Sequence, residues 1–183
     1  TINTNNLEEG GLIGFALDPN FATNRYAYFH YTAPSGPTHR VSRISVNQNN
    51  TLDFSSESIL FTYFIQQDDC CHLGGSMDFD SQGNLYISTG DNTNPFQSDG
   101  YEPMDERNGR SVYDAQKSSS NTNYLRGKIL RITPTADGGY DIPAGNLFTQ
   151  DNLHRGEIYT MGHRNPFRIA IDQENDELFW GEV

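Results

Sequence analysis

Small, apolar and polar residues alternate along three stretches of the chain, and the three stretches share one order. A short alternating run ends in aspartate, a polar turn follows, and an apolar or aromatic run comes after the turn. The turns use residues that accept tight or left-handed backbone, while β-branched and aromatic residues fill the flanks, as in β-hairpins. The pattern therefore predicts three hairpins, formed by residues 14–18 with 26–29, 75–80 with 85–88, and 168–172 with 178–180.

Further alternating runs extend the first two hairpins into sheets. They are residues 40–46 with 58–65, and 128–133 with a short hairpin through Asp137-Gly138-Gly139 to Ile142. Each unit then becomes an antiparallel sheet of about four strands, with the hairpin aromatics in its core. Repeated four-stranded sheets indicate an all-β fold, the β-propeller, whose blades bury their faces on each other around a central channel. A β-sandwich with one long loop is the alternative that the same pattern allows.

The spacing of the hairpins predicts an incomplete propeller. Asp18 and Asp80 are 62 residues apart, and Asp80 and Asp172 are 92 apart. At that spacing the 183 residues supply about two and a half blades, whereas a ring needs about four to eight. We therefore expect residues 1–183 to form one partial propeller, completed by a longer polypeptide or by another chain. Residues 90–125, rich in Gly, Asn, Ser and Asp, are expected to form a long loop on the ligand-binding face.

Composition and charge exclude two classes of protein. The chain has 12 Lys and Arg against 24 Asp and Glu, a net charge of −12, and no cationic cluster, so it is not expected to bind nucleic acid. Its apolar runs are only a few residues long, so no membrane span is expected. An apolar content of 34% alone would favour disorder, but 12% aromatic residues indicate a folded core.

Cys70 and Cys71 are adjacent and are the chain's 2 cysteines. They form either a vicinal disulfide, whose Cα separation lies outside the usual range, or two reduced thiols that pack as small hydrophobes. A zinc site is not expected, because no second cluster of Cys or His follows at ligand spacing.

His72 follows the cysteines directly and precedes Gly74 and Gly75, where bare backbone lets a flat ligand approach closely. A histidine in such a loop is, taken alone, more often a structural hydrogen-bonding group. Asp91 ends the next hairpin, so an out-and-back path returns it to the same edge as His72. A carboxylate that accepts from one ring nitrogen would leave the other nitrogen free as a general base.

Hard oxygen donors crowd the start of the long loop, and they suggest a structural calcium site. The candidate ligands are Asp91, Asn92, Asn94 and Asp99. Their spacing does not match the EF-hand loop, and Asn-Pro and Asp-Gly turns explain the same composition without a metal.

Arg164 and Asn165 stand just before the third hairpin, in the position that His72 occupies before the second. Arginine offers a planar donor fork for carboxylates or quinone oxygens, and asparagine offers both a donor and an acceptor. The starts of such strands lie near the central channel of a propeller. An arginine paired with acidic surface residues is the alternative.

These stretches together resemble the soluble pyrroloquinoline-quinone (PQQ) dehydrogenases of the glucose/sorbosone type. The resemblance is carried, in family order, by residues 9–21, 72–76 with 83–91, 125–132 and 162–166. It implies a six-bladed propeller of which this chain is about half, and a quinoprotein that oxidises a sugar or polyol hydroxyl. It also implies PQQ and Ca²⁺ as cofactors, an external electron acceptor, and a periplasmic or secreted location, where a vicinal disulfide would persist.

The resemblance also implies roles for single residues. His72 would take the hydroxyl proton while hydride passes to the quinone, and Asp91 would orient it. Arg164 and Asn165 would polarise the reactive quinone carbonyl and position the cofactor. The family's active-site calcium is held by residues expected beyond Val183.

Three positions depart from the pattern of the glucose enzymes, so glucose itself is not implied as the substrate. Glu9 stands where the glucose enzyme has a glutamine near the substrate, Cys71 where it has an aspartate, and Phe167 where many relatives have a glutamine. Other quinoprotein alcohol dehydrogenases stack a vicinal disulfide on the cofactor plane. We therefore expect a Cys70–Cys71 disulfide beside or over the quinone.

A second function is consistent with the same scaffold. Relatives of this propeller in extracellular signalling keep the fold without redox chemistry, and the chain would then be a carbohydrate- or protein-binding module. The presence of His72, Asp91, Arg164 and Asn165 together favours the enzyme.

Overall fold

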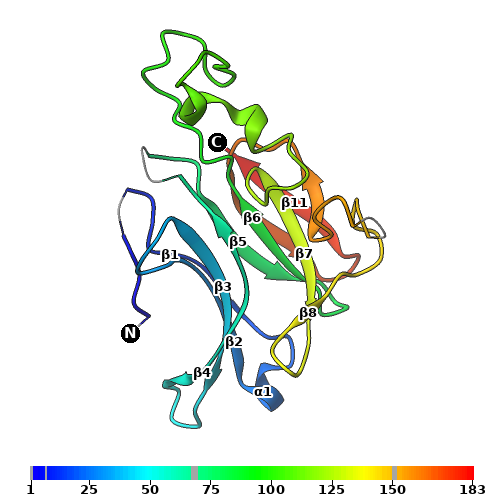
Figure 1. Ribbon diagram of the computed structural model, residues 1–183. Coiled ribbons are helices and arrows are strands. Elements are labelled where there is room, and N and C mark those ends of the chain that lie inside the picture. Colours follow the sequence, from blue (N-terminus) through cyan, green and yellow to red (C-terminus); the bar gives the residue numbers. More distant parts are fainter. Residues whose placement is uncertain (1, 7, 67–69, 150–151) are drawn as a thin grey trace.

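A computed structural model describes residues 2–6, 8–66, 70–149 and 152–183 of the chain. In this part of the chain the strands form three antiparallel sheets (Figure 1). The first sheet has the order β1-β2-β3-β4, and the short helix α1 (Phe21–Asn24) lies in the connection between its first two strands. Its strands are β1 (Leu12–Leu17), β2 (Tyr26–Thr32), β3 (Thr38–Val46) and β4 (Leu52–Phe64).

The second sheet begins with the predicted hairpin and ends differently from the prediction. Its strands are β5 (Gly74–Phe79), β6 (Leu85–Thr89), β7 (Lys128–Pro134), β8 (Tyr140–Asp141) and β9 (Ile158–Met161). The sequence predicted the hairpin that reaches Ile142 as the fourth strand. Instead β9 pairs with the start of β7, and the two-residue β8 pairs only with its last residues, Thr133 and Pro134.

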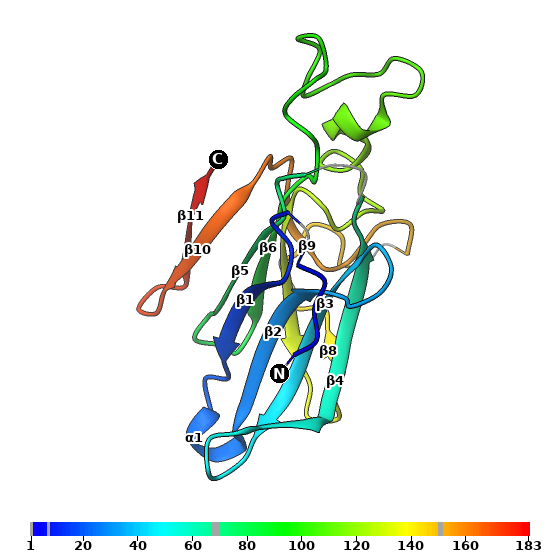
Figure 2. The same ribbon diagram turned by 90° about the vertical axis from the view of Figure 1, so that its left-hand side faces the viewer.

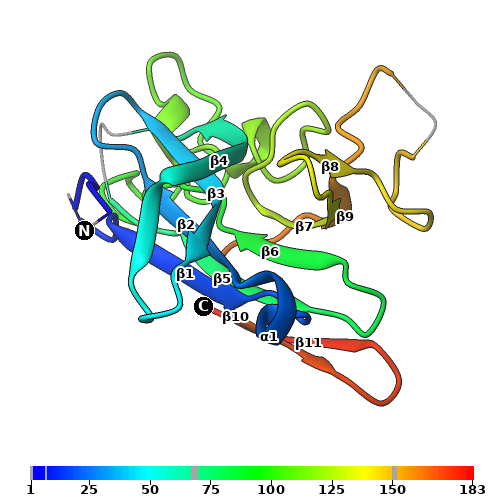
Figure 3. The same cartoon turned by 90° about the horizontal axis from the view of Figure 1, so that it is seen from below.

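The third sheet is the third predicted hairpin, β10 (Pro166–Asp172) with β11 (Glu177–Glu182). The first strands of the three sheets lie next to one another, because β5 packs against both β1 and β10. Figures 2 and 3 show the sheets standing side by side with these strands at the shared edge. This is the arrangement of consecutive propeller blades, so the β-sandwich alternative is wrong.

Apolar side chains between neighbouring sheets form the core. Tyr28 and Val41 of the first sheet pack with Phe79 and Ile87 of the second, and a further cluster joins the second sheet to the third. Not every hairpin aromatic is buried as predicted. Phe15, Phe179 and Trp180 are exposed. Phe15 and Phe179 lie on the outward faces of the first and third sheets, whereas Trp180 is paired with Ile169 and lies on the inner face of the edge strand β11.

Residues 90–127 connect β6 to β7, and they contain the predicted long loop 90–125, which lies at one end of the sheets (Figure 1). The loop contains two single turns of 3₁₀-helix, η1 (Ser111–Tyr113) and η2 (Ala115–Lys117). Lys128, fully buried, anchors it to the sheet, because its Nζ donates to the carbonyl oxygens of Ser118, Ser119 and Arg126 at 2.8–2.9 Å. None of the helices in the described ranges is long and apolar enough to cross a membrane.

Candidate active site

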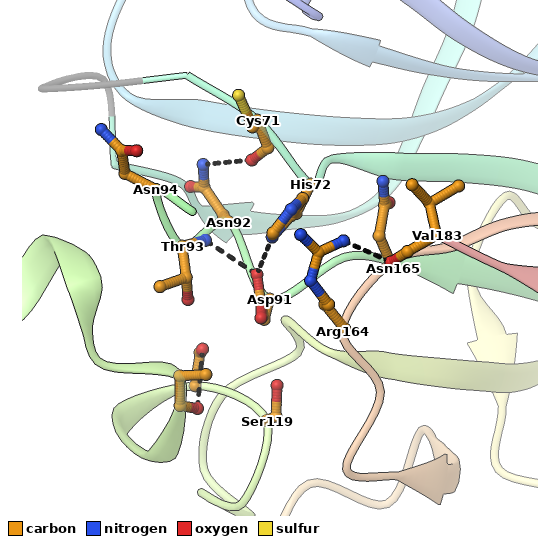
Figure 4. Close-up of polar contacts among 12 residues, drawn as sticks. Cys71, His72, Asp91, Asn92, Thr93, Asn94, Ser119, Arg164, Asn165 and Val183 are labelled. Carbon is orange, nitrogen blue, oxygen red and sulfur yellow. Dashed lines mark hydrogen bonds and ion pairs between the residues drawn. The ribbon is translucent and has the colours of Figure 1, made fainter. Parts of the chain in front are cut away.

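The predicted catalytic and cofactor-binding residues lie on three connections at the loop end of the sheets. Cys70, Cys71 and His72 precede β5, Asp91 follows β6, and Arg164 and Asn165 precede β10. Because β5 and β6 are antiparallel, the start of one and the end of the other share an edge. β10 packs against β5 and brings the third connection to the same place (Figure 4).

His72 and Asp91 form a buried hydrogen-bonded pair. The distance from His72 Nδ1 to Asp91 Oδ1 is 2.8 Å, and the two residues are 5% and 1% exposed. The same oxygen accepts from the Thr93 backbone N–H at 2.8 Å, which fixes the carboxylate. A proton shared on the Nδ1 side leaves Nε2 of His72 as the ring's acceptor.

The backbone that carries His72 is in an uncommon conformation. Cys71 and His72 both have positive φ, 93° and 57°. The His72 carbonyl accepts from Asn92 N at 3.0 Å. Gly90 lies against this carbonyl so closely that a Cβ at position 90 would overlap it. The segment therefore needs glycine at the end of the β6 hairpin for His72 to reach its place.

Arg164 and Asn165 are tied to the same segment through the backbone. Asp91 N donates to the Arg164 carbonyl at 2.8 Å, and Gly74 N donates to Asn165 Oδ1 at 3.0 Å. Asn165 is buried, whereas the Arg164 side chain is exposed and its Nη1 donates to the Val183 carbonyl. The structure thus brings both residues together with His72 and Asp91.

Cys70 and Cys71 form the predicted vicinal disulfide, and both residues are half-buried. Asn92 Nδ2 donates to the Cys71 carbonyl at 3.4 Å. Glu9, which precedes β1, contacts the same segment: its Oε2 accepts a hydrogen bond from Leu73 N at 3.3 Å. Its carboxylate is exposed and lies beside the residue that follows His72.

The four candidate calcium ligands each have a different protein partner. Asp91 bonds His72, Asn92 Oδ1 accepts from Gln66 N, Asn94 Oδ1 accepts from Phe96 N, and Asp99 pairs with Arg107. Within the described ranges no group of three or more His, Cys, Asp or Glu side chains could hold a metal ion. The structure does not bring the four together as a ligand set, and calcium in this loop stays a prediction.

A buried polar network that the sequence did not predict lies within the first sheet. The Tyr63 hydroxyl contacts His30 Nε2 at 2.9 Å and His39 Nδ1 at 2.8 Å, and His39 Nε2 contacts Thr32 Oγ1 at 3.1 Å. Burial lowers the pKa of His30 to about 4. Burial, and next the charge of His30, hold the pKa of His39 well below its usual value. Both rings are therefore neutral at pH 7.

Arg126 is a further buried residue that the sequence analysis did not identify as a candidate. It is 3% exposed, and its Nε and Nη1 have no hydrogen-bond partner among the described residues. Burial lowers its pKa, opposed by the charges of Tyr124, Asp91 and Tyr63. The only sequence signal was its place in the Leu-Arg-Gly-Lys stretch that leads into β7.

Several known proteins are similar to this chain. The aldose sugar dehydrogenase YliI of Escherichia coli (strain K12) is 26% identical over 179 residues, which make up 95% of this chain and 41% of the relative. The Hedgehog-interacting protein of Homo sapiens is 24% identical over 182 residues, 93% of this chain and 24% of the relative. The chain thus spans less than half the length of these relatives.

Solved structures agree with the predicted architecture. The PQQ-bound form of an aldose sugar dehydrogenase from Streptomyces coelicolor is similar with a TM-score of 0.70 at 26% identity, over 99% of this chain and 44% of that one. This likeness confirms a β-propeller segment of four-stranded antiparallel blades that covers about half of its relatives. Residues 3–183 match the family model described as Glucose / Sorbosone dehydrogenase, and the chain therefore belongs to that family.

Proposed function

We propose that this chain supplies the base, its orienting carboxylate and part of the cofactor site of a quinoprotein dehydrogenase that oxidises a sugar or polyol hydroxyl. The observation that carries the proposal is the buried His72–Asp91 hydrogen bond of 2.8 Å. Asp91 is in turn bonded through its backbone to Arg164 at 2.8 Å. The candidate base and its orienting group are thus bonded directly, and the backbone bond holds the residue that carries the guanidinium beside them.

In the proposed reaction the substrate loses a proton from its hydroxyl oxygen and a hydride from the attached carbon, and a carbonyl forms. His72 Nε2 takes the proton, because Nδ1 is engaged with Asp91. Asp91 holds the ring in this tautomer and stabilises the imidazolium that results. When bound, PQQ supplies the hydride acceptor.

The residues around His72 fit a flat anionic quinone. Arg164 presents an exposed guanidinium, which suits a carboxylate or a carbonyl oxygen. Asn165 Oδ1 is engaged with Gly74 N, so its amide nitrogen is the group that can donate to a ligand. The half-buried Cys70–Cys71 disulfide directly precedes His72 and offers a compact apolar surface on the same connection.

The remaining elements of the proposal rest on family membership. Ca²⁺ would accompany the quinone, held by residues of the whole protein outside this chain, and an external acceptor would reoxidise the cofactor. Glu9, bonded to Leu73 N, would face the substrate. A protein with this chemistry and a vicinal disulfide would work in the periplasm or outside the cell.

Reconstitution tests the proposal. The full-length protein with PQQ and Ca²⁺ should reduce a redox dye in the presence of one or more aldoses or polyols. His72→Gln should lower kcat about 10²- to 10⁴-fold, because it removes the general base. His154→Gln is the matched control, since its ring bonds Thr122 away from the site, and it should stay active. A protein that binds no quinone and oxidises no sugar would overturn the proposal.

A non-catalytic binding module is the second candidate. The match to the Hedgehog-interacting protein over 93% of this chain favours it. Failure of reconstitution, combined with binding of a carbohydrate or a protein to the loop end of the sheets, would support this function instead.

A further inference from the structure

Arg126 follows the long loop and comes opposite Asp91 in the register of the second sheet. β6 and β7 pair as far as Lys128, and the hydrogen bond of 2.8 Å from Gly127 N to the Gly90 carbonyl extends the ladder by one step. The next step of the same register is Arg126 with Asp91. Side chains opposite each other on antiparallel strands are close enough to interact, so the register brings the guanidinium near the carboxylate that orients His72.

The Arg126 guanidinium is buried without a hydrogen bond. The residue is 3% exposed, and its Nε and Nη1 have no partner among the residues that the structure describes. Its Cζ lies 5.6 Å from the centre of the Phe64 ring and 5.7 Å from that of the Tyr124 ring. In such an environment the charge is little screened by water. A buried cation without a partner is costly, so a negative charge nearby is expected to compensate for it.

Asp91 is the complementary case, a buried carboxylate to which no lysine or arginine side chain bonds in the described ranges. It is 1% exposed, and its Oδ1 accepts from His72 Nδ1 and from Thr93 N. Its negative charge acts on Arg126 and opposes the lowering of the arginine pKa by burial. Two buried charges of opposite sign, each without an ionic partner in direct contact, thus lie near each other.

The two other cations near the site are engaged elsewhere. The Nζ of Lys128 donates to three backbone carbonyls at 2.8–2.9 Å. The Arg164 side chain is exposed, and its Nη1 donates to the Val183 carbonyl. Arg126 is therefore the buried cation whose charge is left to compensate for that of Asp91.

We propose that Arg126 is a positioning residue, whose buried charge stabilises Asp91 as a carboxylate and thereby holds the His72 ring with Nε2 free to accept a proton. A charged carboxylate accepts a stronger hydrogen bond than a neutral one, so the His72 Nδ1–H is bound more firmly. Because Arg126 acts without a hydrogen bond, it does not compete with His72 and Thr93 for Asp91 Oδ1. The inference rests on the proposed function and adds a residue to its machinery.

A double-mutant cycle measures the coupling without cofactor or turnover. The melting temperature of the full-length apoprotein is compared for the parent, Arg126→Met, Asp91→Asn and the double variant. Each single substitution leaves one buried charge without its counter-ion, so each should lower the melting temperature. The double variant removes both charges, and its loss should be clearly smaller than the sum of the single losses. Additive losses would overturn the inference. If R126M does not fold, Arg126→Gln takes its place in the cycle.

Rescue by lysine separates the charge of Arg126 from its packing. In the reconstituted full-length protein R126M should lower kcat about tenfold or more, with the KM for the sugar within about twofold of the parent. Arg126→Lys keeps the charge, and its kcat should stay within about threefold of the parent. The matched control is Arg43→Met, since Arg43 is also buried but bonds the carbonyls of Thr135 and Ala136 beyond the far end of β7. Its kcat should equal that of the parent.

Nuclear magnetic resonance reports the His72–Asp91 hydrogen bond directly. The downfield proton signal of His72 Nδ1–H, assigned by its loss in His72→Gln, should be lost or shifted in R126M and kept in R126K. An unchanged signal and kcat in R126M, or equal impairment of R126M and R126K, would overturn the inference. A parent that oxidises no sugar, yet shows the coupling and the signal change, would overturn the proposed function alone.

Discussion

At Cys71 and His72 two consecutive residues other than glycine hold positive φ, a conformation that costs about 1–3 kcal/mol each. The surroundings compensate for this cost. The disulfide joins Cys71 to its neighbour, the His72 carbonyl accepts from Asn92 N, and the His72 ring is bonded to Asp91. These contacts hold the backbone in the strained conformation, and they thereby fix the orientation of the His72 imidazole.

The disulfide should matter more for the cofactor than for stability. We expect the double variant Cys70→Ser, Cys71→Ser of the full-length protein to bind PQQ about tenfold more weakly, because the rigid apolar ring beside His72 is lost. Its melting temperature should change little, since an eight-membered ring removes little entropy from the unfolded chain. Reduction of the parent with dithiothreitol should reproduce the effect. An unchanged quinone affinity, measured by fluorescence titration, would contradict it.

The buried His30 should make stability depend on pH in a definite direction. Its pKa is lowered to about 4 in the folded protein and is near 6.5 when unfolded. Below pH 6.5 the unfolded chain therefore binds a proton that the folded chain does not, and stability falls as pH falls towards 4. Between pH 7 and pH 5 this group alone should lower the free energy of unfolding by about 2 kcal/mol.

Urea unfolding of the full-length protein at the two pH values measures this loss. His30→Gln removes the titrating ring, so the variant should lose less stability between pH 7 and pH 5 than the parent. An equal loss in both proteins would show that His30 does not titrate as described.

The contacts that could be predicted from the sequence differ from those that could not in how the chain brings the two side chains together. His72 and Asp91 are joined by one hairpin, so local chain geometry brings them together, and their hydrogen bond followed from the sequence. His30, His39 and Tyr63 come from three different strands of the first sheet and meet only through its register. No spacing in the sequence distinguishes them from other inward-facing residues.

Among the elements, the strands with clear alternation and turn residues were predicted, and the strand without them was missed. β9 has four residues and follows a connection with no periodic pattern, so nothing marked it as the fourth strand of the second sheet. The hairpin to Ile142 had strong turn residues and was chosen in its place, although it yields only the two-residue β8. The long loop was predicted from its polar composition, but its buried anchor Lys128 was not.

Gly90 tests how the β6 hairpin sets the position of His72. A Cβ at this position would overlap the His72 carbonyl, which is backbone and cannot rotate away. We therefore expect Gly90→Ala to lower the melting temperature of the reconstituted protein and to reduce its kcat for sugar oxidation at least tenfold, because His72 must shift. The matched control is Gly139→Ala, whose Cβ would meet its nearest neighbour at an ordinary 3.4 Å. Equal behaviour of the two variants in dye-reduction assays would contradict this account.

For the whole molecule, the two outermost sheets present apolar faces. Phe15 and Leu17 are exposed on the outward face of β1, and Phe179 is exposed on the outward face of β11. Inner sheet faces in this chain are covered by the next sheet, and the relatives are more than twice as long as the matched region. We therefore propose that the remaining blades of the propeller cover these two faces.

If that proposal is right, two phenylalanines that are exposed in this chain are buried in the full-length protein, and their substitution should destabilise it as a core substitution does. Phe15 and Phe179 are 54% and 56% exposed in this chain, and Phe96, in the long loop, is 61% exposed. If further blades pack on β1 and β11, Phe15→Ala and Phe179→Ala should each lower the free energy of unfolding of the full-length protein by about 2 kcal/mol or more. Phe96→Ala should stay within about 0.5 kcal/mol of the parent, as surface substitutions do. Urea unfolding decides the question, because equal small effects of all three substitutions would mean that the two faces remain open to solvent.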